Sequence, residues 1–274
     1  MMNFVNRSGR HSLLLVLTCA AIIAGCASYK PTAEPGLGYL QLQALPNSVS
    51  IVPPPPEPGS IAFAVDEEYS QRSFALHDTP AWTLATLDAD LTFPHTAGTF
   101  SCALNAPITE KDTPHLYMLL RLTMEDVENS THVAKAHYRR SRPFLLNKKN
   151  ICTPEKQAPL EKSWSYPSGH SAIGMAWALI LTEISPEQTD AILARAQAFG
   201  LSRIICNVHW YSDIIQGCFI GTDTVARLHA DPNFREDLEA AKAELEVVRD
   251  KGLKPTGDCS AEAEAVDRQR SLEH

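Results

Sequence analysis

The sequence predicts an all-α fold: a single-domain helical bundle around one buried central helix, preceded by an extended, proline-rich segment. Helical spacing of apolar residues recurs over residues 61–252, whereas few segments alternate polar and apolar residues as half-buried strands do. Residues 171–184 are apolar on nearly every side, which is typical of a helix at the centre of a domain. Four successive prolines at positions 53–56 favour an extended chain before the bundle.

Several helices are predicted to begin at a polar cap residue followed by proline. Proline suits the first helical turn because it lacks an amide hydrogen, and an amide hydrogen at that position would have no partner within the helix. Such starts stand at Thr79-Pro80, Thr113-Pro114, Ser185-Pro186 and Asp231-Pro232. Apolar spacing then predicts helices over residues 82–91, 116–127, 192–199 and 234–248, with a further helix over 130–141. Residues 253–274 are polar, and we expect a disordered tail there.

Residues 1–25 resemble a lipoprotein signal peptide. Two arginines precede an apolar run over residues 13–24, which is too short to span a bilayer. The run ends in Ile23-Ala24-Gly25-Cys26, which resembles a bacterial lipobox, so Cys26 is predicted to carry lipid. An ordinary signal peptide cut nearby, or a short membrane anchor with an incidental cysteine, are the alternatives. The lipobox predicts a protein anchored on the periplasmic side of a bacterial membrane, by expectation the outer membrane.

Residues 26–60 are rich in proline, glycine and serine and are predicted to tether the domain, residues 61–252, to that membrane. For the second half of this segment, a strap packed on the surface of the domain is the alternative.

Five cysteines remain after the leader and Cys26, so at most two disulfides can form. They are Cys102, Cys152, Cys206, Cys218 and Cys259. Cys206 and Cys218 fall in one predicted helical stretch, about 18 Å apart, which disfavours a bond between them. The pairing otherwise stays open. No cysteine or histidine spacing is typical of a zinc site, and the sequence predicts neither a metal nor another cofactor.

The net charge of −8 argues against a nucleic-acid partner, because an acidic protein repels phosphate backbones. No acidic residue lies between Glu128 and Glu155, however, and that stretch holds six basic residues. They are Lys135, Arg139, Arg140, Arg142, Lys148 and Lys149. This run is either a local anion-binding patch or an ordinary solvated surface.

Two further motifs carry candidate chemistry. Ser168, Gly169 and His170 directly precede the predicted central helix, where free backbone amides favour an anion; a simple N-cap and turn is the alternative. Further along, His209 and Asp213 are spaced to meet on one helical face, so that the carboxylate would accept the Nδ1 hydrogen and leave Nε2 unprotonated. A purely structural pair, or a metal-ligating one, are the alternatives.

Together these pieces resemble the signature of the type-2 phosphatidic acid phosphatase superfamily, which includes the vanadium haloperoxidases: K-x6-R-P, P-S-G-H and S-R-x5-H-x3-D. Every position is filled here, by Lys135, Arg142 and Pro143, by Pro167, Ser168, Gly169 and His170, and by Ser202, Arg203, His209 and Asp213. From about residue 52 to 248 the chain is similar to the bacterial class A nonspecific acid phosphatases. It departs from them at Ser171, where they usually have threonine, and in its lipobox.

The resemblance implies a role for each of these residues. His209 would attack phosphorus and form a phosphohistidine, Asp213 would orient it, and His170 would transfer protons. Lys135, Arg142 and Arg203 would bind the phosphoryl oxygens, together with Ser168 and the Gly169 amide. The implied activity is acid hydrolysis of water-soluble phosphomonoesters such as nucleotides, sugar phosphates and aryl phosphates. Homo-oligomers are also implied.

Three other functions compete. A phosphatase of lipid phosphates or pyrophosphates is disfavoured because the chain after the leader has no apolar run of 18 or more residues. A vanadate-dependent haloperoxidase would use the same oxyanion pocket. An inactive anion-binding lipoprotein is disfavoured because binding needs only the cations and would not require His170, His209 and Asp213 together.

Overall fold

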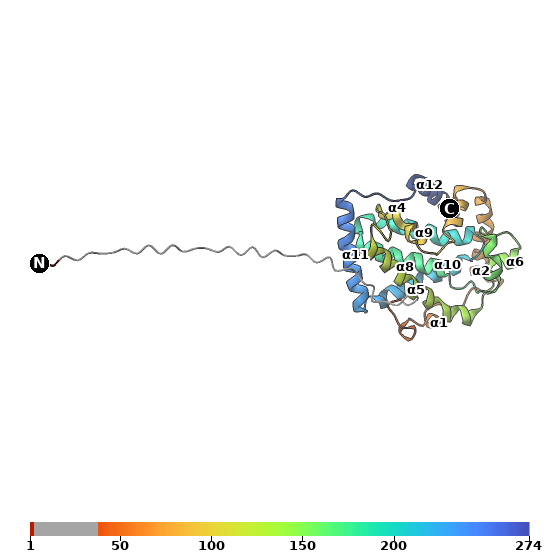
Figure 1. The fold of residues 1–274 in the computed structure, drawn as a ribbon. Helices are drawn as coiled ribbons and strands as arrows, with labels where there is room; N and C mark the ends of the chain where they lie inside the picture. The colour runs from red at the N-terminus through yellow and green to blue at the C-terminus, as the bar shows by residue number, and fades with distance from the viewer. Residues whose placement is uncertain (3–37, 274) are drawn as a thin grey trace. The chain divides into compact units, whose positions relative to one another are not determined.

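The computed structural model describes residues 1–2 and 38–273, and every regular element in this part of the chain is a helix (Figure 1). This confirms the all-α prediction. The α-helices are α1 (Ser48–Ile51), α2 (Ile61–Ser73), α3 (Pro80–Leu87), α4 (Ser101–Leu104), α5 (Pro114–Tyr138), α6 (Pro143–Asn147), α7 (Gln157–Glu161), α8 (Gly169–Ile184), α9 (Thr189–Ile205), α10 (Tyr211–Leu228), α11 (Pro232–Asp250) and α12 (Cys259–Arg270). Short 3-10 turns lie at Leu42–Ala44, Phe74–Leu76, Thr96–Phe100, Pro154–Lys156, Pro186–Gln188 and Ser271–Glu273.

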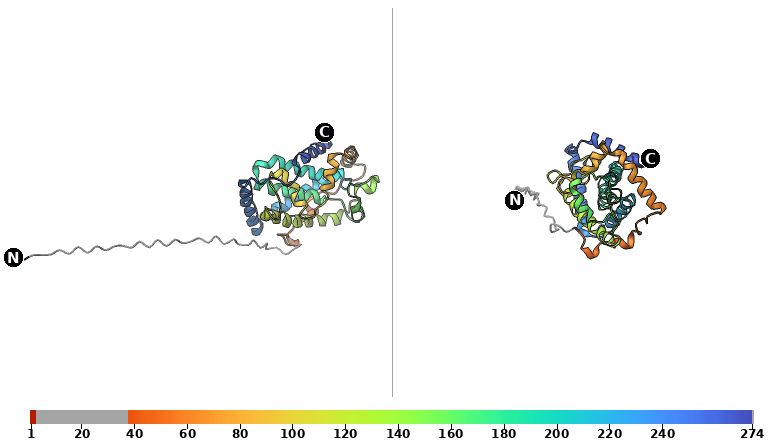
Figure 2. Two further views of the ribbon diagram at one scale, coloured as in Figure 1. Left: turned by 45° about the horizontal axis from the view of Figure 1, so that its top comes forward. Right: turned by 90° about the vertical axis from the view of Figure 1, so that its right-hand side faces the viewer.

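The predicted central helix is α8. It lies within the bundle (Figure 2) and packs against α5, α9, α10 and α11. Its Trp177 side chain is fully buried. Two glycines let α10 approach its backbone: a Cβ at Gly217 would lie 2.4 Å from the Ser168 carbonyl oxygen, and one at Gly221 would lie 2.2 Å from that of Ala172. These contacts hold the first turn of α8 beside the second and third turns of α10. The Ser168 amide also donates to the Asp213 carbonyl at 2.9 Å, in the first turn of α10, where the site described below is built.

The proline-marked starts are confirmed for α3, α5 and α11, which begin at Pro80, Pro114 and Pro232. Ser185-Pro186 opens a 3-10 turn that leads into α9. The two helices predicted over residues 116–127 and 130–141 are instead one continuous helix, α5. Its middle residues, Ser130 and Thr131, donate their hydroxyls to backbone carbonyls of the preceding turn, so they do not interrupt the helix.

The predicted continuous helix containing Cys206 and Cys218 is wrong, because α9 ends at Ile205 and α10 begins only at Tyr211. Asn207, between them, adopts a left-handed conformation with φ 60°. Cys206 is bonded to Cys152 and Cys102 to Cys259, whereas Cys218 is unpaired. The two disulfides therefore resolve the pairing that the sequence left open.

The prediction of a disordered tail is also wrong within residues 253–273. Residues 259–270 form α12, whose first amides are capped by the Asp258 carboxylate. The helix packs against α3 and α9, buries Ala265 and Gln269, and is tied to α4 through Cys259. Tertiary anchoring thus orders a segment that its composition alone would leave unfolded.

The described part of the predicted tether, residues 38–60, packs on the bundle as a strap. The backbone amides of Tyr39 and Leu40 donate to the Asp126 carboxylate, Val52 is buried, and the Tyr166 hydroxyl donates to the Pro53 carbonyl. The signal peptide and Cys26 lie outside the described residues. Among the helices that the structure describes, none is both long and apolar enough to cross a bilayer.

Candidate active site

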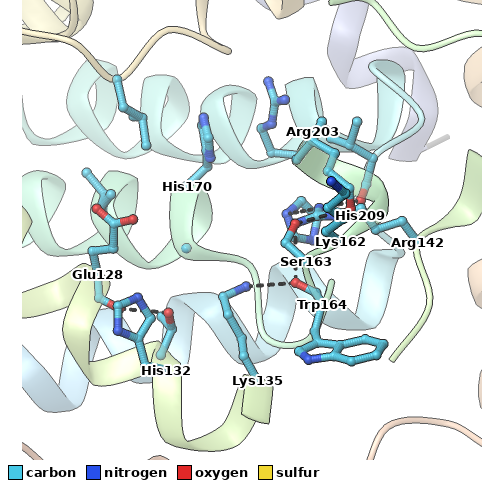
Figure 3. Close-up of a pocket in the computed structure, with 16 residues that line it drawn as sticks. Glu128, His132, Lys135, Arg142, Lys162, Ser163, Trp164, His170, Arg203 and His209 are labelled. Atoms are coloured by element: carbon cyan, nitrogen blue, oxygen red, sulfur yellow. Dashed lines mark hydrogen bonds between the residues drawn. The ribbon is translucent and has the colours of Figure 1, made fainter. Parts of the chain in front are cut away.

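The three sequence motifs meet at one cavity of about 460 Å³ (Figure 3). Its wall contains most of the predicted site residues: Lys135 from α5, Arg142 from the start of α6, Gly169 and His170 from the start of α8, Arg203 from the last turns of α9, and His209 from the loop before α10. Figure 3 shows Lys135 on one side of the cavity and His170 and Arg203 on the other. Ser168 and Asp213 are buried behind this wall.

The loop that carries His209 is fixed from both sides. Cys206 is bonded to Cys152, and the side-chain amides of Asn207 and Asn147 exchange two hydrogen bonds of 2.7 and 3.0 Å. These contacts hold the left-handed turn at Asn207 and present His209 to the cavity.

Both ring nitrogens of His209 have defined partners. Nδ1 lies 3.2 Å from Oδ2 of Asp213, and Nε2 lies 3.1 Å from Nη1 of Arg142. A guanidinium can only donate, so Nε2 must be the unprotonated nitrogen and Nδ1 must carry the hydrogen. His209 and Asp213 therefore pair as predicted. They do not lie on one helical face, however, because His209 precedes α10 and Asp213 lies in the first turn of α10, where its carboxylate also accepts the Trp210 amide at 2.9 Å.

The surroundings keep His209 neutral. Burial of the ring, and then the nearby charges of Arg142, Lys135 and Arg203, hold the pKa of His209 well below its usual value. An imidazole that stays unprotonated in an acidic medium keeps its lone pair available as a nucleophile.

His170 is the second imidazole in the wall. Its pKa is also held well below the usual value, by burial first and then by the positive charge of Arg203. Its Nε2 is buried without a hydrogen-bond partner among the described residues. This nitrogen is therefore available for a hydrogen bond to a molecule bound in the cavity.

Three cations converge on the cavity. The ammonium group of Lys135 donates to the Pro167 carbonyl at 2.6 Å and to that of Trp164 at 3.3 Å, and burial together with Arg142 lowers the pKa of Lys135 to about 7. Burial lowers the pKa of Arg142 and of Arg203 to about 10, so both stay charged. The Nε atoms of both arginines are buried without partners among the described residues, so each has a donor to offer to an oxyanion.

Of the two predicted phosphate-binding residues at the start of α8, Gly169 lines the cavity and Ser168 does not. The Ser168 hydroxyl caps α8 by accepting the Ser171 amide at 3.3 Å, and it does not line the cavity. Gly169 does line it, and a Cβ there would meet no atom within 4 Å. Its amide, at the first position of α8, has no carbonyl partner within the helix. Phosphate binding by the Ser168 side chain therefore remains a prediction.

The sequence did not identify Arg140 and Asp66 as site residues. Nη1 of Arg140 lies 2.6 Å from Oδ1 of Asp213, and Nη2 lies 2.5 Å from Oδ2 of Asp66. Asp66 in turn accepts the Ser212 amide at 2.7 Å. Arg140 belongs to the basic run, but no spacing links that run to an acid 74 residues earlier. Only the fold brings the two together.

No group of three or more histidine, cysteine or acidic side chains arranged to hold a metal ion is found within residues 38–273. The cavity wall instead combines buried cationic donors, helix-start amides and two neutral imidazoles. This arrangement can bind a tetrahedral oxyanion and place one imidazole in line with a bond to it.

The chain is similar to known proteins over most of its length. A model of the PAP2 superfamily matches residues 115–236. A non-specific acid phosphatase of Providencia stuartii is 42% identical over 215 residues, covering 78% of this chain and 87% of the relative. One of Salmonella typhimurium is 39% identical over 201 residues, covering 73% and 80%. An acid phosphatase of Zymomonas mobilis is 38% identical over 196 residues, covering 72% and 74%. The chain therefore belongs to the class A nonspecific acid phosphatases of the PAP2 superfamily.

Proposed function

We propose that this protein is an acid phosphatase that hydrolyses water-soluble phosphomonoesters, including nucleotides, sugar phosphates and aryl phosphates, through a phosphohistidine at His209. The observation that carries the proposal is the pair of contacts on that ring, 3.2 Å to Asp213 and 3.1 Å to Arg142, which leave Nε2 unprotonated inside a cationic cavity. The names of the relatives, nonspecific and acid phosphatases, support the same activity.

In the first step, the lone pair of His209 Nε2 attacks phosphorus in line with the ester bond. The P–N bond forms as the P–O bond breaks, and the leaving oxygen takes a proton from His170. The free alcohol departs. Nδ1 of His209 keeps its hydrogen and donates it in a hydrogen bond to the Asp213 carboxylate, which stabilises the positive charge that develops on the ring.

Because burial and Arg203 hold the pKa of His170 below its usual value, we propose that this proton comes with the substrate. A phosphomonoester has a second pKa of about 6, so at acidic pH it enters as a monoanion that carries one proton. Nε2 of His170 has no other partner among the described residues, and it is the group that we assign to receive this proton and pass it to the leaving oxygen. An acidic optimum follows from this route.

In the second step, the now neutral His170 takes a proton from water as the water oxygen attacks phosphorus and the P–N bond breaks. His170 then gives this proton to the departing phosphate, so both histidines return to their starting, neutral states. Lys135, Arg142 and Arg203 neutralise the charge on the phosphoryl oxygens throughout, a role that positively charged groups must fill in phosphoryl transfer. We therefore propose a reaction that needs no metal ion.

A panel of substrates tests the activity: p-nitrophenyl phosphate, nucleoside monophosphates, sugar phosphates and phosphatidate, each with and without excess chelator. We expect hydrolysis of the soluble monoesters under both conditions. Activity confined to phosphatidate would overturn the substrate class. Loss of activity with chelator, restored by a divalent metal, would overturn the metal-free mechanism.

We also propose that the protein is lipid-anchored at Cys26 on the periplasmic side of the membrane, by expectation the outer membrane, because a lipobox follows a short apolar run in the leader. Cys26→Ser should abolish incorporation of labelled palmitate and partitioning into detergent. Cys218→Ser, which removes an unpaired thiol within the domain, is the matched control. Equal partitioning of both variants and the wild type would refute the anchor.

A further inference from the structure

One acidic residue, Glu128, lines the cavity at some distance from the cations that converge there. Glu128, His132 and Lys135 all line it and all belong to α5. Spacings of four and three residues place them on one face of the helix, and Figure 3 shows them along the same side of the cavity. Glu128 precedes Lys135 by about 10 Å along the helix axis, at 1.5 Å per residue. This separation is comparable to the reach of a small leaving group that extends from a phosphoryl group at Lys135.

Glu128 differs in charge from the rest of the wall. The charged residues that line the cavity are the cations Lys135, Arg142, Lys162 and Arg203 and one carboxylate, that of Glu128, among the described residues. Glu128 is exposed, and its carboxylate takes part in none of the salt bridges found within residues 38–273. Its charge is therefore not cancelled by a bonded cation and acts on whatever occupies that end of the cavity.

We propose that Glu128 is a specificity-determining residue: it disfavours phosphomonoesters whose leaving group carries a second negative charge and so favours those with an uncharged leaving group. The inference rests on the phosphatase activity proposed above and adds a substrate class to it. The cations at Lys135, Arg142 and Arg203 attract any anionic substrate, so by themselves they would favour the more highly charged ester. The Glu128 carboxylate, at the end of the cavity where the leaving group would lie, repels a negative charge on that group and so opposes the preference for the more highly charged ester.

The size of the effect follows from the separation. Two like charges about 5 to 10 Å apart in a partly hydrated cleft repel each other enough to change binding by about three- to tenfold. The repulsion exists whenever the substrate is bound, so it should appear mainly in KM rather than in kcat. It should also weaken as salt screens the exposed carboxylate.

Glycerol 3-phosphate and 3-phosphoglycerate provide a matched pair, because they differ by a hydroxymethyl group in place of a carboxylate. The measured quantity is the ratio of kcat/KM for the neutral substrate to that for the acidic one, at one fixed pH and at low and high salt. We expect Glu128→Gln to lower this ratio by about three- to tenfold at low salt, through KM for 3-phosphoglycerate, and by less at high salt.

Glu125→Gln is the control, because it removes the same charge from α5 at a residue that does not line the cavity. We expect it to leave the ratio unchanged. An unchanged ratio in Glu128→Gln, or an equal change in both variants, would overturn the proposal. Hydrolysis of p-nitrophenyl phosphate by the wild type is measured in parallel, so a failure of the proposed phosphatase activity itself is seen separately.

Discussion

Nη1 of Arg142 lies 3.1 Å from Nε2 of His209 and donates to the lone pair that is proposed to attack phosphorus. The same guanidinium is also held by the Val208 carbonyl at 2.9 Å and by the Ser163 hydroxyl at 3.0 Å. Attack therefore requires Arg142 to exchange the ring nitrogen for a phosphoryl oxygen. Arg142 thus connects substrate binding to exposure of the nucleophile: an anion that draws the guanidinium away frees the nitrogen that reacts with it.

Replacing Arg142 should affect both the binding of the phosphoryl group and the protonation of His209. Removing an oxyanion donor from a buried site costs about 10²- to 10³-fold in rate, and we expect a loss of this size in kcat/KM for Arg142→Ala. Arg142 is also the charge that most lowers the pKa of His209, so its removal should raise that pKa. A raised pKa protonates the nucleophile at higher pH, so the acidic limb of the pH–rate profile should move toward neutral pH.

Lys149→Ala is the control for this variant, because it removes an exposed cation of the same basic run that does not line the cavity. The pH–rate profile of each variant, measured with p-nitrophenyl phosphate, gives both readouts. An Arg142→Ala enzyme with wild-type rate and an unmoved acidic limb would contradict the role assigned to Arg142.

Lys135 should set part of the alkaline limb. Burial and the neighbouring Arg142 lower its pKa to about 7, so the ammonium is charged below that pH and loses its charge as pH rises through it. Loss of the charge weakens phosphate binding, so kcat/KM should fall above about pH 7. In Lys135→Arg the cation stays charged, because a guanidinium titrates far above this range, so the part of the fall that Lys135 causes should move to higher pH.

Lys162→Arg is the matched control, since Lys162 also lines the cavity but does not donate to the Pro167 and Trp164 carbonyls that hold Lys135. We expect its profile to follow that of the wild type. Identical alkaline limbs in the wild type and Lys135→Arg would show that another group controls the fall.

The C-terminal helix should contribute to stability. The Cys102–Cys259 bond joins residues 157 apart in sequence, and the buried Gln269 of α12 donates to the Ser202 hydroxyl at 2.9 Å. We expect Cys259→Ser to lower the free energy of unfolding by about 2 to 4 kcal/mol, as loss of a native disulfide commonly does. Denaturant unfolding measures this change, with Cys218→Ser as the control that leaves both disulfides intact. Equal midpoints for the two variants would contradict it.

The sequence predicted the helical class, the starts of α3, α5 and α11, and the three motifs that meet at the cavity, because proline at a first turn and a charged motif at fixed spacing are local signals. The break before α10 was missed because it depends on the left-handed turn at Asn207, held by contacts with Asn147 and Cys152 from another segment. Ordering of α12 was missed because a polar helix with few buried residues is stabilised here by a disulfide to a distant cysteine. Arg140 was seen only as one member of a basic run, because its partners are 73 and 74 residues away.

His209 as nucleophile and His170 as proton-transfer group should respond differently to substitution when the leaving group needs no proton. The measurement is rapid-quench release of p-nitrophenol by His170→Ala and His209→Ala, followed by analysis of the labelled protein. p-Nitrophenolate leaves without needing a proton, so His170→Ala should still form the phosphoenzyme and then stall, because no base remains to activate water. We expect a burst close to one p-nitrophenol per site in His170→Ala, with acid-labile, alkali-stable phosphate on His209, and neither burst nor label in His209→Ala. A His209→Ala enzyme that turns over, beside a His170→Ala enzyme without burst or label, would show that the nucleophile is not His209.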